Sequence, residues 1–332
     1  MKKVVIVTNS VTGGGAENSM LKLHKEFLHE NMNSTLLALN ADGLDWSSDS
    51  NIIELGRKWK AGSGETLDAL RNFRRVIRSK NPEAIILNCE LPELYGALSK
   101  FSASKLFVVE HTSRPWYQRR AMGVAVRLIL KWRSVTWVTV NSQDQTIWPF
   151  RQQGRFIPNP INLPISNRSH KTLESLVFVG RLRPEKRAIW AIELAAELNL
   201  PLDVYGAGSE LENLKRESEL LGARVIFHGY DQDVWTKIES GQLVVVPSEF
   251  EGDGIVVLEA IATDCPIILA DNEDLRRFNL ADANYGASAK EMAMKIKDNP
   301  LEKFQVSREV RSKLLKNRSI ERVAQEWVNL IN

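Results

Sequence analysis

LVVVPSEFEGDGIVVLEA, residues 243–260, is the stretch of sequence that decides the fold. Its first part is a short apolar run, rich in β-branched residues, that stops at Pro247, which is the pattern of a buried strand. A loop with two glycines and acidic side chains follows, and a second apolar run, IVVLEAIA, begins a helix near Ile255. A buried strand that leads through a glycine-containing loop into a helix is the repeating unit of a doubly wound α/β domain.

The loop and the start of this helix could hold a ligand. Glu251 and Glu259 are available for the hydroxyls of a sugar or a ribose. They could instead be surface acids, but a helix that is otherwise apolar buries most of its faces, so Glu259 needs a polar partner. Backbone N–H groups at a helix start can point at a phosphate. Here these groups belong to Gly252, Asp253, Gly254, Ile255 and Val256.

Strand-like runs separated by helix-length segments recur along the whole chain. They cover residues 4–8, 35–39, 84–88, 106–110 and 135–141, and then 176–179, 202–205, 225–228, 243–246 and 266–270. Residues 186–199 and 209–221 have helical periodicity. Near-continuous apolar strands alternating with helices indicate parallel sheets covered on both faces. We therefore expect two tandem Rossmann-like, doubly wound α/β domains with a ligand cleft between them.

The length of the chain agrees with two domains. Its 332 residues exceed one ordinary α/β core, and the proline-containing stretch RFIPNPINLPISNRSH, beginning at Arg155, suits a connector. We expect a first domain over residues 1–157, a linker over 158–174 and a second domain over 175–332. The final helix of the second domain could cross back to the first domain.

Composition places the chain among globular proteins. The net charge of +3 gives no reason to expect nucleic acid as a partner. Cys89 and Cys265 lie far apart in apolar stretches without zinc spacing, which is typical of buried, reduced thiols in a cytoplasmic protein. The short apolar run in MKKVVIVTNS leads into a glycine-rich turn, so it predicts a first strand rather than a signal peptide. No stretch has the apolar length of a membrane-spanning helix.

Two further loops follow predicted strands. Gly13, Gly14 and Gly15 precede a helix, so backbone N–H groups could approach an anion there, although a tight turn without a ligand would look the same. The sequence matches neither GxGxxG nor a Walker motif. In FVGRL, Arg181 follows the strand and Lys186 comes just before a helix, which offers two cations to a diphosphate. A solvated basic turn is the alternative.

Taken together, these motifs resemble the retaining GT-B glycosyltransferases of family 4. That family has a glycine-rich first loop, a GRL…K turn that opens the second domain, and PSxxEGFGxxxxEA near the donor. This chain has GGGAE at 13–17, GRL at 180–182 followed by Lys186, and PSEFEGDGIVVLEA at 247–260, in the same order. It departs from the family at Asp253, where an aromatic residue is usual, and at Pro160, where the linker usually reads PNG.

The resemblance implies roles for these residues. Arg181 and Lys186 would bind the donor diphosphate, Glu259 the ribose and Glu251 the donor sugar. A histidine after a strand of the first domain would contact sugar hydroxyls and the transition state without acting as nucleophile, and His111 has this position. A lone histidine is more often structural. Because Lys186 and Glu259 are assigned to the ligand rather than to the core, we expect Lys186→Ala and Glu259→Ala to weaken donor binding and leave the fold intact.

The expected reaction is transfer of a sugar from a nucleoside diphosphate sugar to an acceptor hydroxyl, with anomeric retention. The first domain would bind the acceptor and the second the nucleotide sugar, a UDP-sugar in preference to a GDP-sugar. The resemblance implies no bound metal, and we expect no other cofactor. A sugar-nucleotide epimerase of the same fold, or a binding protein that has lost turnover, are the alternatives.

A basic stretch of the first domain could bind peripherally to the inner face of the cytoplasmic membrane. Between His111 and Gln143 there is no acidic residue, while tryptophans and a tyrosine are interleaved with basic residues. Such a segment could lie on an anionic bilayer, with a lipid-linked surface glycan as acceptor, although a solvated helix face is the alternative. The basic residues are Arg114, Arg119, Arg120, Arg127, Lys131 and Arg133.

Overall fold

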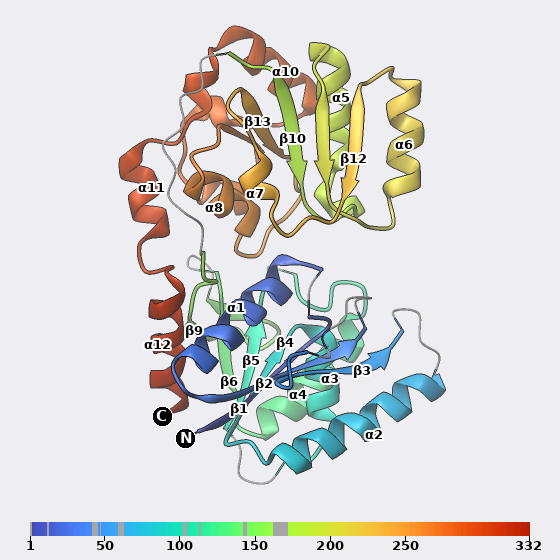
Figure 1. The fold of residues 1–332 in the computed structure, drawn as a ribbon, viewed down its shortest axis with the longest axis vertical. Helices are drawn as coiled ribbons and strands as arrows, with labels where there is room; N and C mark the ends of the chain where they lie inside the picture. The colour runs from blue at the N-terminus through green and yellow to red at the C-terminus, as the bar shows by residue number, and fades with distance from the viewer. Residues whose placement is uncertain are drawn as a thin grey trace. The chain divides into compact units, whose positions relative to one another are not determined.

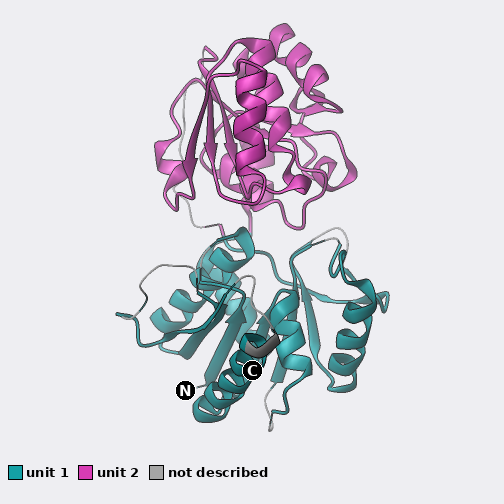
Figure 2. Ribbon diagram, turned by 90° about the vertical axis from the view of Figure 1, so that its right-hand side faces the viewer, with its two compact units in different colours: residues 1–160, 317–332 teal, residues 161–316 magenta. Residues whose placement is uncertain are grey.

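The computed structural model describes residues 2–11, 13–41, 46, 48–58, 63–101, 105–112, 114–141, 145–161 and 172–332. The chain forms two compact units (Figure 2). Unit 1 contains residues 1–160 and 317–332, and unit 2 contains residues 161–316. Most of the expected linker, residues 162–171, lies outside the described residues. Each unit has its own sheet and hydrophobic core.

Unit 1 is built on a seven-stranded parallel sheet of order β3-β2-β1-β4-β5-β6-β9 (Figure 1). The strands are β1 (Lys3–Thr8), β2 (Asn33–Asn40), β3 (Ile52–Arg57), β4 (Ala84–Asn88), β5 (Lys105–Glu110), β6 (Thr136–Thr139) and β9 (Arg155–Phe156). A small antiparallel hairpin joins β7 (Thr146–Ile147) to β8 (Gln152–Gln153). The helices are α1 (Gly15–His29), α2 (Ser63–Lys80), α3 (Glu90–Ala97), α4 (Arg120–Trp132) and α12 (Ile320–Ile331).

The two faces of this sheet carry separate cores. Val4 and Ile6 of β1 pack in one core with side chains of α1 and α12, while Val5 and Val7 pack in another with side chains of α2, α3 and α4. Because successive side chains of a strand point to opposite faces, a strand covered on both sides is apolar throughout. This explains why β1 appears in the sequence as an unbroken apolar run.

Unit 2 repeats the same architecture with a six-stranded parallel sheet of order β12-β11-β10-β13-β14-β15. The strands are β10 (Ser175–Val179), β11 (Leu202–Tyr205), β12 (Val225–Gly229), β13 (Gln242–Val246), β14 (Ile267–Ala270) and β15 (Tyr285–Gly286). The α-helices are α5 (Ala188–Leu198), α6 (Leu211–Leu220), α7 (Val234–Lys237), α8 (Ile255–Ala262), α9 (Glu273–Arg276), α10 (Ala289–Asp298) and α11 (Arg308–Leu315). Short 3₁₀ turns cover Pro184–Lys186, Asp282–Asn284 and Leu301–Phe304.

The predicted fold class, two Rossmann-like α/β domains in tandem, is confirmed. In both sheets the first strand lies in the middle and the order reverses beside it, between β1 and β4 in unit 1 and between β10 and β13 in unit 2. In doubly wound sheets, ligands bind beyond the carboxyl ends of the strands at this reversal. The edge strand β3 and the two-residue strands β9 and β15 have no counterpart among the strands expected from sequence.

The last helix belongs to unit 1 although the chain reaches it from unit 2. Ser319 caps α12 by accepting a hydrogen bond from the backbone N–H of Arg322. Trp327 is buried and meets Phe107 of β5 edge to face, with ring centroids 5.8 Å apart. The ammonium group of Lys2 donates to the carbonyl of Ile331 at 3.1 Å, which holds the two ends of the chain together.

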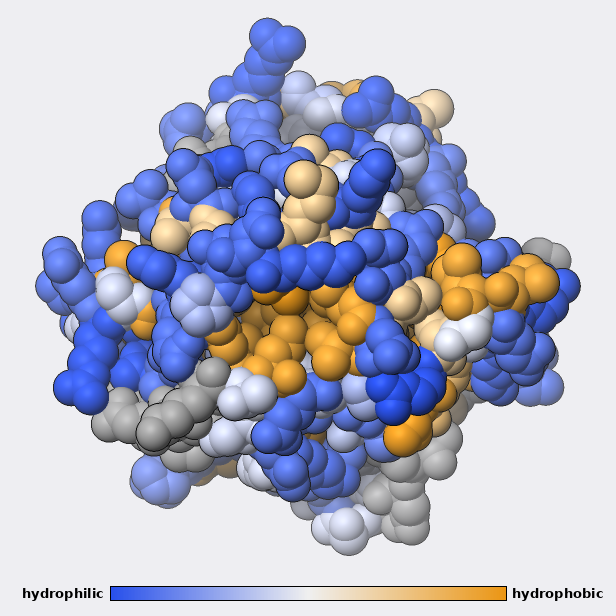
Figure 3. Space-filling view, turned by 90° about the horizontal axis from the view of Figure 1, so that it is seen from above, coloured by the Kyte–Doolittle hydropathy of each residue, from blue (hydrophilic) through white to orange (hydrophobic). Residues whose placement is uncertain are grey.

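The surface carries hydrophobic as well as charged residues. Figure 3 shows a central area of hydrophobic residues bordered by hydrophilic ones on the face seen from above. In unit 2, exposed large hydrophobic residues include Leu220 at the end of α6 and Ile226 in the edge strand β12. Among the described residues no helix is long and apolar enough to cross a membrane. Cys265 is buried as expected, whereas Cys89 is only partly buried.

Candidate active site

The centre of the predicted donor site is an ion pair in unit 2. The Lys186 ammonium group donates to Glu251 Oε1 at 2.6 Å, and both side chains are largely shielded from solvent. The loops that carry them are also joined through the backbone, since the N–H of Glu249 donates to the carbonyl of Glu185 at 2.8 Å. The structure thus brings together two residues that lie 65 positions apart in the chain.

The ion pair sets the charge state of Glu251. Burial by itself would raise the pKa of this carboxyl group, but the Lys186 ammonium, a hydrogen bond from Ser248 and the charge of Arg277 together hold the pKa below its ordinary value. Glu251 is therefore ionised at neutral pH. It can accept hydrogen bonds from sugar hydroxyls.

The loop between β13 and α8 depends on glycine. Gly254 caps α8 with φ +67°, a left-handed conformation, and a Cβ atom there would lie 2.7 Å from Cζ of Phe278. Only glycine adopts this left-handed backbone conformation without strain and also leaves room for the Phe278 ring. The helix begins at Ile255, as predicted. In this loop Gly252, Ile255 and Val256 are partly buried, while Asp253 is buried.

Glu259 has the polar partner that its apolar helix required. Its Oε2 accepts a hydrogen bond from the indole N–H of Trp235 at 2.8 Å. Lys186 has a protein partner as well. The expectation that these two side chains serve the ligand alone, so that their loss leaves the fold intact, is therefore not supported, because each also stabilises unit 2.

Arg181 lies at the carboxyl end of β10 and is exposed. The chain around it is held by the neighbouring loop, because the N–H of Leu182 donates to the carbonyl of Ala207 at 2.9 Å. This close approach requires Gly206, where a Cβ atom would stand only 1.8 Å from the carbonyl oxygen of Gly180. The Arg181 guanidinium therefore projects from a fixed backbone at the sheet edge.

Two residues beside Glu251 were missed by the sequence reasoning. Asp274 accepts the backbone N–H of Glu251 at 3.0 Å, and the charge of Arg277 acts on the Glu251 carboxylate. Both lie in or just after the short helix α9, in a stretch that matches no motif. Because only tertiary packing brings α9 to the loop, no local pattern could have found them.

In unit 1 the glycine-rich loop precedes α1. Gly14 is the N-cap residue and the helix begins at the exposed Gly15. Asn88 of β4 fixes this helix start, donating to the carbonyl of Ala16 at 3.4 Å and to Thr8 Oγ1 of β1 at 3.3 Å. The first N–H groups of a helix have no partner within the helix, so they remain suited to an anion.

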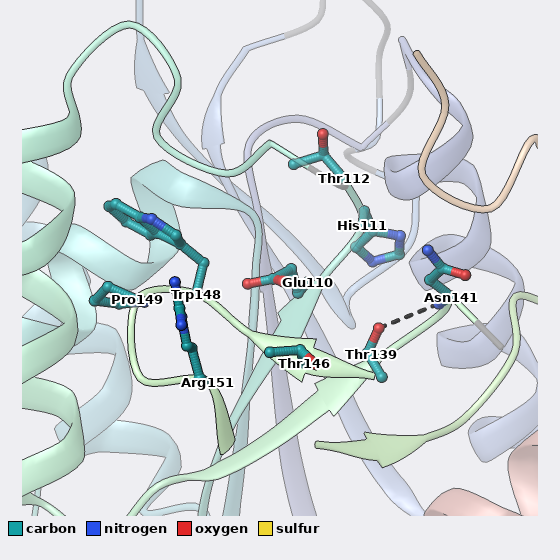
Figure 4. Close-up of a pocket in the computed structure, with 9 residues that line it drawn as sticks. All are labelled: Glu110, His111, Thr112, Thr139, Asn141, Thr146, Trp148, Pro149 and Arg151. Atoms are coloured by element: carbon teal, nitrogen blue, oxygen red, sulfur yellow. Dashed lines mark hydrogen bonds between the residues drawn. The ribbon is translucent and has the colours of Figure 1, made fainter. Parts of the chain in front are cut away.

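His111 follows β5 and lines a cavity of about 370 Å³ at the carboxyl ends of β5 and β6 (Figure 4). In Figure 4, His111 and Asn141 lie at one side of the cavity, while Trp148 and Arg151 lie at the other. Asn141 donates its backbone N–H to Thr139 Oγ1 at 3.2 Å. The lining residues are Glu110, His111, Thr112, Thr139, Asn141, Thr146, Trp148, Pro149 and Arg151.

The structure corrects the membrane-facing set predicted from sequence. Arg127 is fully buried, where its guanidinium forms ion pairs with Glu93 and Glu110. Burial would lower the pKa of Arg127, but these two carboxylates outweigh it and raise the pKa. The sequence prediction failed for Arg127 because nothing in the sequence of α4 shows that this arginine lies among the buried apolar residues. Its partners, Glu93 and Glu110, belong to α3 and β5.

Arg133 is also engaged within unit 1. It donates to the carbonyl of Gly96 at 2.7 Å and to the carbonyl of Ser99, next to the end of α3. Trp116 and Trp137, two of the aromatic residues in the basic stretch, are buried. The exposed basic residues of the predicted set are Arg114, Arg119, Arg120 and Lys131.

Comparison with known proteins agrees with this architecture. Residues 162–293 match the family model described as glycosyl transferases group 1. The match lies in unit 2, and the two-unit fold as a whole is shared with solved structures of glycosyltransferases. Among the described residues there is no group of three or more His, Cys, Asp or Glu side chains arranged to hold a metal ion.

Three distant relatives match over most of the chain. The putative glycosyltransferase EpsF of Bacillus subtilis is 24% identical over 310 residues, which covers 82% of this chain and 79% of EpsF. The crystal structure of Anabaena HepE in complex with UDP and glucose has a TM-score of 0.81, 16% identity and coverage of 100% of this chain and 99% of HepE. The structure of WaaG, a glycosyltransferase involved in lipopolysaccharide biosynthesis, has a TM-score of 0.71, 15% identity and 99% coverage of both chains.

Proposed function

We propose that the protein is a retaining, metal-independent glycosyltransferase that moves a sugar from a UDP-sugar to an acceptor hydroxyl in the synthesis of a bacterial-type surface glycan. The observation that carries the proposal is the Lys186–Glu251 pair beside the start of α8, in the segment that matches the glycosyltransferase model. A fixed cation and a fixed carboxylate beside one helix N-terminus suit the diphosphate and the sugar of a single donor.

Unit 2 has the groups that departure of the nucleotide requires. As the bond to the sugar breaks, negative charge develops on the leaving diphosphate. Arg181, Lys186 and the N–H groups at the start of α8 would neutralise this charge in place of a metal ion. Glu251 would orient the donor sugar and Glu259 the ribose. In unit 1, the helix start at Gly14 and Gly15 would offer backbone N–H groups to an anionic group of the ligand.

The acceptor is assigned to the cavity of unit 1. His111 at its edge would contact sugar hydroxyls and stabilise the transition state rather than act as a nucleophile. UDP is favoured as the nucleotide because HepE, which shares the fold, is described in complex with UDP and glucose. A surface glycan is favoured as the acceptor because WaaG, of the same fold, is involved in lipopolysaccharide biosynthesis.

The test begins with a thermal-shift screen of UDP- and GDP-sugars, each with and without EDTA. Candidate glycan acceptors are then added to the donor that binds. A transferase releases nucleotide in an acceptor-dependent manner, whereas an epimerase converts the donor without an acceptor and a binding protein does neither. The anomeric coupling of the product by NMR decides retention, and an inverted product would exclude the retaining assignment.

We further propose that unit 1 docks on an anionic bilayer through the outer face of α4. This face carries exposed apolar side chains at positions 121, 125, 128, 129 and 132, a spacing that keeps them on one side of a helix. Leu128 is 51% exposed, Ile129 42% and Trp132 94%. Arg120 and Lys131 lie on the same helix, and Arg119 is its N-cap residue.

An apolar stripe flanked by cations and free of carboxylates suits the boundary between headgroups and acyl chains. Each cation near an anionic surface contributes about 1 kcal/mol, an attraction that salt weakens. Liposome co-sedimentation should show binding to anionic vesicles that falls with salt, and reduced binding in Arg119→Glu/Arg120→Glu. Trp132→Ser should weaken partitioning about tenfold, while the exposed Leu67 of α2 provides the matched control, Leu67→Ser. Equal binding of all variants would leave a soluble acceptor as the better proposal.

A further inference from the structure

The wall of the unit 1 cavity opposite His111 is a tight hairpin turn. Trp148, Pro149 and Arg151 lie between β7 and β8 and line the cavity. The turn is closed by a hydrogen bond of 3.0 Å from the N–H of Arg151 to the carbonyl of Ile147. Outside it, the N–H of Gly154 donates to the carbonyl of Gln145 at 2.8 Å. The turn therefore has a defined backbone.

The buried Arg127 fixes this turn from behind. Its Nη1 donates to the carbonyl oxygen of Trp148 at 2.5 Å and also to Glu110 of β5. Its guanidinium lies 5.7 Å from the ring centroid of Trp148. Glu93 of α3 in turn holds Arg127 through two hydrogen bonds, of 2.8 and 3.0 Å. A side chain held by charge-assisted bonds from several elements is preorganised, so the Trp148 ring presents a fixed face.

Arg151 differs from every other charged group around the cavity. Within the described parts of the chain its guanidinium makes no hydrogen bond or ion pair, although it lines the cavity. Its φ of 52° lies in the left-handed region, which is costly for a residue with a side chain. Such strain persists where surrounding structure enforces it and is often found at ligand sites. The turn thus holds an uncompensated cation at the cavity.

The carboxylate that also lines the cavity does not cancel this cation. Glu110 Oε2 is bound to Arg127, so this carboxylate is held in an ion pair within the wall. Arg127 is shared with Glu93, so the buried group of one cation and two carboxylates has a net charge of −1, against which Arg151 and Lys131 supply two positive charges. The second carboxylate on Arg127, that of Glu93, is buried behind it and also accepts the indole N–H of Trp116 at 2.9 Å. Near the turn there is a further cation, because the ammonium of Lys131 lies 4.4 Å from the ring centroid of Phe150.

We infer that the cavity binds an acidic sugar. Arg151 holds the phosphate or carboxylate group of the sugar, and the sugar ring packs against the indole of Trp148. An aromatic face with several hydroxyl and amide groups suits a pyranose, and a guanidinium suits an oxyanion of either kind. The inference rests on the proposed function, since it specifies the acceptor as an acidic glycan. It names the charge that the acceptor must carry, which the glycosyltransferase fold leaves open.

The test compares charged and neutral probes of the same ring by saturation-transfer NMR titration. The pairs are methyl glucuronide with methyl glucoside, and glucose 6-phosphate with glucose, all in saturating UDP so that the nucleotide site is occupied. We expect the charged member of at least one pair to bind about tenfold more tightly, and the pair that responds identifies the source of the charge. Arg151→Gln should abolish this preference and Trp148→Ala should weaken all probes.

The matched control is Arg155→Gln, which removes an exposed arginine of β9 outside the cavity lining and should keep the preference. Equal binding of charged and neutral probes, or a preference that survives Arg151→Gln, would overturn the inference. UDP-sugar binding, measured in the same variants by thermal shift, should be unchanged. Acceptor-dependent nucleotide release without any charge preference would reject the acidic acceptor and leave the proposed function standing. Absence of nucleotide binding in the wild-type protein would reject the proposed function instead.

Discussion

Replacing Lys186 with methionine tests two roles of this residue, the stabilisation of unit 2 through its ion pair with Glu251 and the binding of the donor diphosphate. In the structure its ammonium group lies 2.6 Å from Glu251 Oε1, and the two side chains are only 18% and 11% exposed. Removing one partner of a shielded ion pair leaves the other charge buried, which costs about 3–5 kcal/mol. Ser248 and Arg277 still act on Glu251, so we expect the lower end, about 3 kcal/mol. The melting temperature should fall by roughly 6–12 °C.

A double-mutant cycle measures the ion pair itself. Glu251→Gln alone should cost less than Lys186→Met, because the flexible lysine stem can turn its ammonium group to solvent. In Lys186→Met/Glu251→Gln no charge is left buried, so the loss should be smaller than the sum of the two single losses by about 1.5–3 kcal/mol. Circular dichroism melts of the four proteins give this difference. A coupling energy near zero would refute the argument that the pair stabilises unit 2.

Measurements of donor affinity test whether Lys186 also binds the diphosphate. If Lys186 also binds the diphosphate, the double variant regains stability but not affinity for the UDP-sugar, which should remain about 1.5–3 kcal/mol weaker. Calorimetric titration well below the melting temperature measures this. Full recovery of affinity together with stability would show that Lys186 supports the site without touching the donor.

The pKa of Glu251 also predicts how the stability of the single variant Lys186→Met depends on pH. In the wild-type protein the pKa of Glu251 is held below its ordinary value, so the pair stabilises the fold above the unfolded pKa of about 4.3 and is lost as the pH falls through the folded pKa. Without Lys186, burial raises the pKa of Glu251. The difference in melting temperature between wild type and variant should therefore shrink as the pH is lowered from about 7 toward about 4.5. A difference independent of pH would contradict this.

Four further changes test other parts of the two units. His111→Ala should lower turnover more than nucleotide affinity, and a loss of affinity with normal turnover of bound donor would contradict its assignment to the sugar. Glu259→Ala should weaken nucleotide binding by about 1.5–3 kcal/mol and also lower the melting temperature, because the Trp235 indole loses its acceptor. Gly254→Ala should destabilise unit 2 by about 2 kcal/mol through left-handed strain and the contact with Phe278, whereas an unchanged melt would show that the loop relaxes at no cost. Arg127→Met should destabilise unit 1 by about 3–5 kcal/mol, since two carboxylates lose their shared cation, and a stable variant would mean that those carboxyl groups become protonated.

Much of the fold could be predicted because its signals are local. Strands β4 and β11 have the same bounds in the structure as in the sequence analysis. Both are inner strands of their sheets, and β4 appears in the sequence as an apolar run that ends at Asn88. In β11 the apolar pattern is interrupted only by the partly buried Asp203. Strand β3, which is mostly only partly buried, and the two-residue strands β9 and β15 were missed. They lie at or near sheet edges, where fewer apolar residues are needed and the pattern is weak.

The sequence by itself determined that the chain has two α/β domains, that α8 begins at Ile255 after a glycine-containing loop, and which charged residues follow strands at the sheet edges. These properties depend on residues within a few positions of one another. Tertiary structure alone decided that Lys186 pairs with Glu251, and that Arg127 leaves the surface to bind Glu93 and Glu110. It also decided that Arg151 lines a cavity with His111. Each of these contacts joins elements that are far apart in the chain. Folding brings the charged groups of such elements together, and a buried charge is stable only when it has a partner.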